Sequence, residues 1–156
     1  MNEISSQYFT RVLLTLLDET FDGVHGYYLD RGTSLFETLS TITAAQASVP
    51  VGGKCATLAA QVKHVSFHLD SVLKWLRDGN QEPLDWGEIW RTVNVVSSVE
   101  WQEIQTELRV NYENVKALIQ FSSDWNSENK IGDAMAILAH TAYHLGEIRQ
   151  ALCTIQ

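Results

Sequence analysis

The chain has 156 residues, of which 45% are hydrophobic, and contains only 2 prolines and 9 glycines. This length and composition fit one globular domain over residues 1–156 and exclude an intrinsically disordered chain. The 11 basic and 19 acidic residues give a formal net charge of -8. Nucleic-acid binding needs a positive surface that displaces counterions, and the sequence has no Lys/Arg cluster to supply one. We therefore expect a protein that acts on a small molecule and not on nucleic acid.

The sequence shows no sign of a membrane span or an export signal. Its apolar stretches are shorter than the roughly 20 residues that cross a bilayer. Met1 leads into polar residues, with no basic segment and no cleavage site after it. We expect a cytoplasmic protein without membrane association. The two cysteines, Cys55 and Cys153, lack zinc-type spacing, so we interpret them as small packing residues, with a redox or nucleophilic role as the alternative.

The first half of the chain has three segments in which apolar residues recur at helical spacing. Residues 4–21 form the first predicted helix. Its predicted apolar face consists of Ile4, Tyr8, Val12, Leu13, Leu16 and Leu17. A glycine-containing loop over 22–33 and a short helix over 34–45 follow. The clearest helix begins after Thr57, a typical N-cap residue, and ends at Gly79.

The second half contains two further long helices. Residues 80–98 are predicted to be a linker with room for one helical turn, and they include Trp86 and Trp90. A helix over 98–121, a polar loop over 124–130 and a final helix over 131–153 complete the chain. Because four long amphipathic helices must cover one another and no segment alternates like a strand, the sequence predicts an all-α fold, a four-helix bundle with long connecting loops.

Four of the five histidines form two pairs with the same spacing. His64 and His68 lie on one predicted helix, and His140 and His144 lie on the last one. Residues four apart lie on one helix face, so two imidazoles at this spacing can bind a common metal ion. The alternative is that the pairs arise by chance and the rings only pack. Thr141 stands where a zinc protease would carry its catalytic Glu, which excludes that class.

Several residues near the final pair have two interpretations. Glu147 is a further ligand, a partner of a ligand or a general base, or else a solvated residue paired with Lys or Arg. Arg149 is an internal salt-bridge partner or an anchor for the carboxylate of a substrate or cofactor. Gly146 is expected to allow a close approach of helices. His25, in the glycine-containing loop, is expected to be exposed. We interpret the five tryptophans as core and loop anchors, and the alternative is a ligand cage.

Two motifs resemble those of the DinB/YfiT-like superfamily. The stretch Thr57-Leu-Ala-Ala-Gln-Val-Lys-His64 is similar to the family's second-helix signature. The closing stretch from Ala139 to Arg149 resembles its final-helix motif, H-x3-H-x-G-x-I-R. The order of helices, loops and the tryptophan-bearing linker is also similar, so the resemblance extends over nearly the whole chain.

The resemblance implies a four-helix bundle with up-down-down-up connectivity and a metal triad of His64, His140 and His144. It leaves His68 out of the triad, so His68 is either an extra ligand or proton shuttle, or a hydrogen-bonded neighbour. Nickel or zinc is the expected ion, and Glu147 or His68 would move protons.

The implied function is a metal-dependent enzyme that binds a low-molecular-weight thiol and transfers it to an electrophile. Metal-assisted hydrolysis is the first alternative. The second is a non-catalytic metal-binding or stress-associated protein, often a homodimer. The third is a plain helical domain whose histidines only pack.

Overall fold

The structure, a computed structural model, describes residues 5–79, 83–122 and 125–155. Within those ranges it is all-helical and has no β-strand, apart from one isolated bridge between Pro50 and Thr57. This confirms the predicted all-α class. The elements in chain order are α1 (Ser6–Phe21), α2 (Leu35–Leu39), α3 (Ala44–Ala47), the 3-10 turn η1 (Val51–Gly53), α4 (Leu58–Asp78), α5 (Glu88–Thr92), α6 (Ser98–Phe121) and α7 (Glu128–Ile155).

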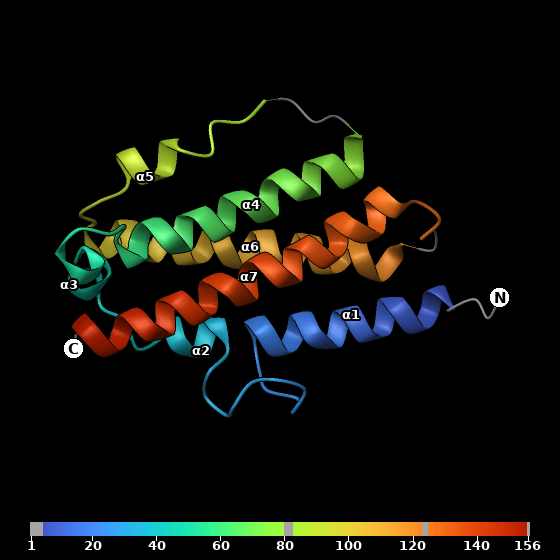
Figure 1. The fold of residues 1–156 in the computed structure, drawn as a ribbon, viewed down its shortest axis with the longest axis horizontal. Coiled ribbons are helices and arrows are strands. Elements are labelled where there is room, and N and C mark those ends of the chain that lie inside the picture. The colour runs from blue at the N-terminus through green and yellow to red at the C-terminus, as the bar shows by residue number, and fades with distance from the viewer. Residues whose placement is uncertain (1–4, 80–82, 123–124, 156) are drawn as a thin grey trace.

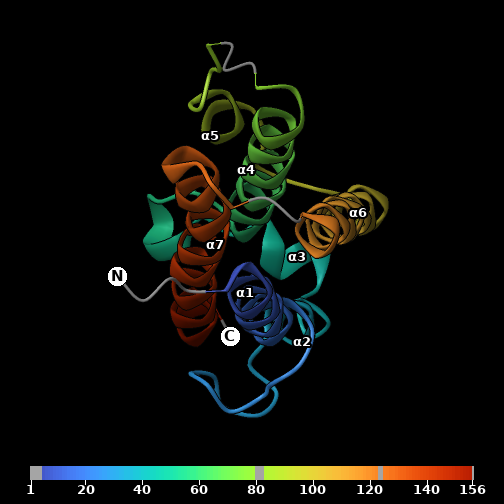
Figure 2. The ribbon, with the colours of Figure 1, turned by 90° about the vertical axis from the view of Figure 1, so that its right-hand side faces the viewer.

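The four long helices α1, α4, α6 and α7 pack along one another (Figure 1). Helix α4 contacts both α6 and α7, and α1 contacts the same two helices. Helices α1 and α7 run in one direction, and α4 and α6 run in the other (Figure 1). The short helices lie outside this group: α2 contacts α1, and α5 contacts α4 on the opposite side of the molecule (Figure 2). None of the helices within the described ranges is long and apolar enough to span a membrane.

Local capping explains the boundaries of the helix that carries His64. The Thr57 side chain accepts a hydrogen bond from the Ala60 N–H at 3.2 Å, which satisfies a free donor of the first turn. At the other end, Gly79 adopts φ 66°, a left-handed conformation that glycine reaches without steric cost, and its N–H donates to the Trp75 carbonyl. The predicted start and end of this helix are therefore confirmed.

Other predicted boundaries need correction. The single helix predicted over 34–45 is two short helices, because Thr43 and Gln46 form a capping box that begins α3 after α2 has ended. The final helix begins at Glu128, so the polar loop before it is shorter than predicted. The linker contains one short helix, α5, as expected. The predicted start at Ile4 lies outside the described residues.

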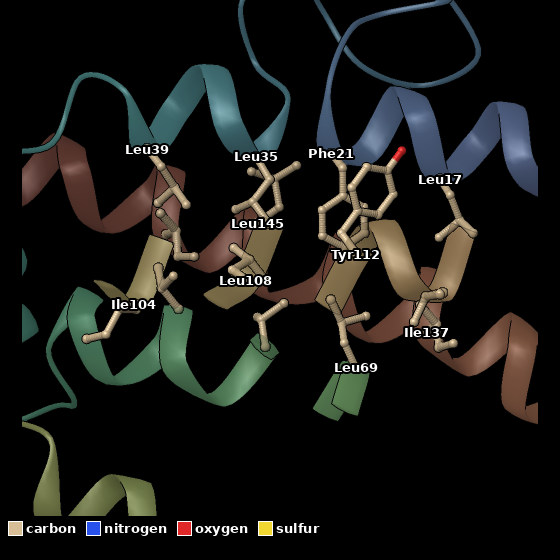
Figure 3. Close-up of a cluster of buried hydrophobic side chains, with 14 of the residues drawn as sticks. Leu17, Phe21, Leu35, Leu39, Leu69, Ile104, Leu108, Tyr112, Ile137 and Leu145 are labelled. Atoms are coloured by element: carbon tan, nitrogen blue, oxygen red, sulfur yellow. The ribbon is translucent and has the colours of Figure 1, made fainter. Parts of the chain in front are cut away.

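The core lies between α1, α4, α6 and α7, with α2 closing one side (Figure 3). Phe21 and Tyr112 stack at its centre, with ring centroids 4.2 Å apart. Part of the predicted apolar face of α1 is wrong, because Tyr8 and Val12 are 60% and 42% exposed. The buried apolar positions on α1 are Leu13, Leu17 and Phe21, which recur every four residues, and Tyr8 and Val12 lie one residue out of that register.

Two further expectations are wrong. Cys55 and Cys153 are exposed, so they do not pack in the core. Cys55 lies in the turn before α4, and Cys153 lies in the last turn of α7, where its thiol is 3.7 Å from the Arg149 carbonyl. Gly146 is also exposed, and a Cβ added to it would meet no atom of another described helix within 4 Å. Gly146 therefore does not mediate a close approach of helices.

A buried carboxylate that the sequence did not indicate fixes the loop after α1. Glu19 is fully buried and accepts backbone N–H groups from His25, Tyr27, Tyr28 and Leu29 at 2.7–3.0 Å. Burial acts to raise the pKa of Glu19, but these four hydrogen bonds outweigh it and lower the pKa from 4.5 to about 2. The ionised carboxylate thus serves as the hydrogen-bond acceptor for four N–H groups of the loop backbone.

This arrangement makes stability depend on pH in a defined window. Because the folded pKa of Glu19 lies below its unfolded value, its contribution is complete above pH 4.5 and is lost as pH falls toward 2. We expect Glu19→Gln to lower the melting temperature on the order of 10 °C at pH 7, with a smaller difference at pH 3. Circular dichroism melts at both pH values measure this. The exposed Glu103→Gln is the control, and equal melting temperatures for Glu19→Gln and wild type at pH 7 would contradict the prediction.

Candidate metal centre

Helices α4 and α7 bring three histidines together where they pack. His64 comes from α4, and His140 and His144 come from one face of α7. Their ring centroids lie 5.0 Å apart from His64 to each of the other two, and 4.5 Å apart within α7. One ligand atom from each residue lies within 4.8 Å of the others. His64 and His144 are each only 7% exposed. The three histidines of the predicted triad are therefore positioned to hold a metal ion together.

The ring nitrogens at this point lack the partners that burial demands. His64 Nδ1 and His140 Nε2 are shielded from solvent and have no hydrogen-bond partner within the described ranges, whereas His144 Nδ1 faces the carboxylate of Glu147 at 2.8 Å. A buried polar atom without a partner costs free energy, and a metal ion supplies a partner for each lone pair. Nitrogens around a tetrahedral ion at 2.0–2.1 Å lie about 3.3 Å apart, so small ring rotations suffice to reach this geometry. The donor set therefore fits a divalent metal.

Burial also keeps these rings neutral. It lowers the pKa of His64 from 6.5 to about 4, and the neighbouring His144 acts in the same direction. Burial, reinforced by the other three clustered histidines, lowers the pKa of His140 to about 3. The pKa of His144 is lowered by burial as well. Metal ligands must be unprotonated, so near neutral pH all three imidazoles are in the form that binds a cation.

His68 lies beside the triad without joining it. Its ring stacks on that of His140, with centroids 3.8 Å apart and planes 18° from parallel. Lone pairs on imidazole lie in the ring plane, so two stacked rings do not direct them at one ion. His68 Nδ1 is buried and has no hydrogen-bond partner within the described residues. The ligand pair His64/His68 that spacing alone suggested is thus not the set that the structure brings together; His68 supports the face of His140.

Glu147 lies next to the triad, one turn beyond His144. Its Oε2 is 2.8 Å from His144 Nδ1. Its side chain is 38% exposed, so Glu147 lies between the histidine cluster and solvent on this side. Within the described ranges its ionic partner is this histidine and not a Lys or Arg. Glu147 is therefore placed to orient His144 or to accept a proton.

Arg149 is directed elsewhere. Its Nη1 donates to Thr38 Oγ1 of α2 at 3.3 Å. Helix α2 lies beside α1, across the molecule from α5 (Figure 2). The structure therefore does not bring the guanidinium to the histidine cluster, and its observed partner is a hydroxyl and not a carboxylate.

His25 is exposed, as expected, and its Nε2 lies 2.5 Å from Asp18 Oδ2.

Two tryptophans reach the centre from the linker. The Trp90 ring lies 4.6 Å from that of His64 and 6.4 Å from that of His144. The Trp86 ring lies 6.3 Å from His64 and 6.1 Å from His68. The interpretation as anchors suits Trp101, whose indole N–H donates to the Ile42 carbonyl. For the linker pair, the missed signal is their four-residue spacing in a segment that follows α4 directly and folds back on it.

The histidine cluster lies next to the linker that carries Trp86 and Trp90, and it does not line the hollow between α1 and α6. A hollow of about 1230 Å³ lies between α1 and the end of α6. Its lining includes none of the four clustered histidines. A large concave pocket is the usual place for a binding site, but in this protein the clustered histidine donors lie outside the hollow.

No protein-family model matches this chain, and neither a curated protein nor a solved structure matches it. The fold and the site define an all-helical protein with a three-histidine cluster suited to a divalent metal ion.

Proposed function

We propose that this protein is a divalent-metal-dependent enzyme of the DinB-like kind, in which His64, His140 and His144 bind nickel or zinc. The observation that carries the proposal is the convergence of three histidines from two helices, of which His64 and His144 are buried and His64 and His140 each have a shielded ring nitrogen without a hydrogen-bond partner within the described ranges. The opposite directions of α1 and α7 against α4 and α6 support the four-helix bundle with up-down-down-up connectivity that this class has.

The proposed reaction transfers a low-molecular-weight thiol to a small electrophile. A bound divalent ion supplies the acidity, since it makes a thiol a thiolate, or water a hydroxide, near neutral pH. The three histidines hold the ion and leave one side for a ligand. Glu147, at the solvent edge beside His144, accepts the proton that leaves. His68 fixes the orientation of His140 by stacking. Arg149 has no part in this proposal, because it contacts α2.

Two measurements on the purified protein test the proposal. Elemental mass spectrometry should find about one nickel or zinc per chain, although the ion recovered also reflects the expression conditions. The loaded protein should then consume a thiol in the presence of an electrophile faster than the metal-free protein does. Absence of metal after incubation with both ions would refute the metal centre, whereas bound metal without thiol turnover would refute only the transferase.

The covering of the centre by Trp90 favours a second candidate, a non-catalytic protein whose ion stabilises the bundle. An ion that binds only the folded state raises stability by mass action. Cobalt(II) in the site distinguishes the two, because an added thiol or water ligand changes its visible spectrum only when a coordination position is free.

Metal-assisted hydrolysis, with water in place of the thiol, would appear as ester or amide cleavage by the loaded protein.

Glu147 provides a further test of the metal centre. We expect Glu147→Gln to weaken metal affinity by about 10- to 100-fold, because a carboxylate beside a ligating imidazole orients the ring and raises its basicity. Titration against a chromophoric chelator measures the affinity. The matched control is Glu128→Gln, an exposed position at the start of the same helix. Wild-type affinity in Glu147→Gln would show that the contact with His144 is incidental.

A further inference from the structure

Trp90 forms the boundary between the histidine cluster and solvent. Its ring contacts those of His64 and His144, two residues that are only 7% exposed, while Trp90 itself is 36% exposed. Because α4 and α7 supply all three nitrogens, the side of the centre that they leave uncovered faces α5, which packs on α4. A ligand that enters from the side of α5 therefore passes along the indole of Trp90.

Trp86 extends this boundary into a larger aromatic surface. Its ring lies 5.3 Å from Phe67 and 6.0 Å from Trp75, both edge-on, besides its contacts with His64 and His68. We call Phe67, Trp86 and Trp90 the aromatic wall.

Local contacts hold the wall in place. Ile89 is buried, Asp85 forms an ion pair with Arg91, and the Gly87 N–H donates to Asp85 at 3.0 Å. A surface fixed in this way can select a ligand by shape, since its side chains need no further ordering on binding.

The charges around the wall indicate what kind of group it accepts. The basic side chains Arg91, Lys63 and Lys74 are already paired, with Asp85, Glu107 and Asp70 respectively, so the described residues near the wall offer no unpaired cation to a carboxylate or phosphate. Three neutral histidines leave a bound divalent ion with its full positive charge, which repels a cationic group beside it. An uncharged aromatic ring is favoured, because it gains offset or edge-to-face contacts with the indoles.

We propose that the aromatic wall is a substrate subsite, which binds an uncharged aromatic ring carried close to the metal-binding atom of the substrate. This rests on the metal centre proposed above and names the class of thiol or electrophile that it accepts. The ligating atom would bind the ion held by His64, His140 and His144, and a ring one or two bonds away would lie against Trp90 and Trp86. A thiol that binds in this way loses its sulfhydryl proton to solvent or to Glu147.

The test compares two thiols that differ only in aromaticity. Benzyl mercaptan and cyclohexylmethanethiol both place an uncharged six-membered ring one carbon from sulfur. With the cobalt(II)-loaded protein, the sulfur-to-cobalt charge-transfer band gives each dissociation constant. We expect benzyl mercaptan to bind about three- to tenfold more tightly, the range that an aromatic pair contributes. Trp90→Leu and Trp86→Leu should each reduce this ratio toward one, and Trp125→Leu, which alters an indole that packs on Phe9, should retain it.

Three outcomes would overturn the inference, and they are distinguishable. Equal affinities in the wild type would exclude an aromatic subsite while leaving the metal centre intact. A ratio that persists in both Trp90→Leu and Trp86→Leu, with normal cobalt content, would place the ring elsewhere. Failure of the wild type to bind cobalt would refute the metal centre itself, and the subsite with it. Two wall variants are used so that misfolding of one, seen by circular dichroism, does not decide the result.

Discussion

His64→Ala, His140→Ala and His144→Ala should each lower metal affinity by more than about 100-fold, so that none retains stoichiometric metal after gel filtration. Each substitution removes one of the three imidazoles, whose ligand nitrogens lie within 4.8 Å of one another. Two imidazoles bind a metal ion far more weakly than three imidazoles do. Elemental mass spectrometry of the wild type and the three variants, incubated in parallel with zinc and with nickel, measures the loss.

The other two histidines are the controls for this experiment. His25→Ala removes an exposed ring that pairs with Asp18, and it should leave metal content unchanged. His68→Ala removes only the stacking on His140, so we expect the metal to remain bound with affinity reduced by less than about tenfold. If His68→Ala lost the metal as completely as His140→Ala, the ligand set would have to include His68. Retention of metal in any one of the three triad variants would likewise exclude that residue as a ligand.

Leu108→Ala should destabilise the protein by about 3 kcal/mol, in the range that a large cavity in a packed core costs. Leu108 is fully buried on α6 and lies near Leu35 of α2 and Leu145 of α7 (Figure 3). The side chains around it are held by different helices, so they cannot collapse readily into the space. For a chain of this length the melting temperature should fall by roughly 10 °C.

Chemical unfolding in urea, followed by circular dichroism, measures this effect. Metal must be removed from all samples with a chelator, because an ion that binds only the folded state adds stability in proportion to its own affinity. Val110→Ala, on the same helix but 52% exposed, is the matched control and should change stability by less than about 0.5 kcal/mol. A loss below about 1 kcal/mol in Leu108→Ala would mean that the core around this residue is not packed as described.

Features that depend on neighbouring residues in the chain were predictable. Thr57 and Gly79 mark the ends of α4 because a cap and a left-handed glycine act within one turn. The spacing of His140 and His144 places both on one face of α7, since the pitch of a helix is independent of the rest of the fold. The all-α class follows from the period of the apolar residues in four long segments. These parts of the prediction are confirmed by the structure.

Register within an amphipathic face was less predictable. Tyr8 and Val12 belong to the apolar periodicity of α1, yet both are exposed, because only contact with α6 and α7 decides which 100° of a broad apolar face is covered. The prediction that both cysteines are packing residues was wrong for a similar reason. Their residue type favours burial, but Cys55 lies in a turn and Cys153 on the outer side of the last turn of α7.

By itself, then, the sequence determined the helices and the two histidine pairs, because each depends on contacts within a few residues. Only the tertiary structure decided which member of the first pair faces the second. His64 is directed at both histidines of α7, whereas His68 stacks on one of them, and this choice depends on how α4 and α7 are aligned. Tertiary structure also placed Trp86 and Trp90 at the centre and buried Glu19 under the loop that follows α1. Such contacts join segments through packing and loop closure, and no local periodicity in the chain records them.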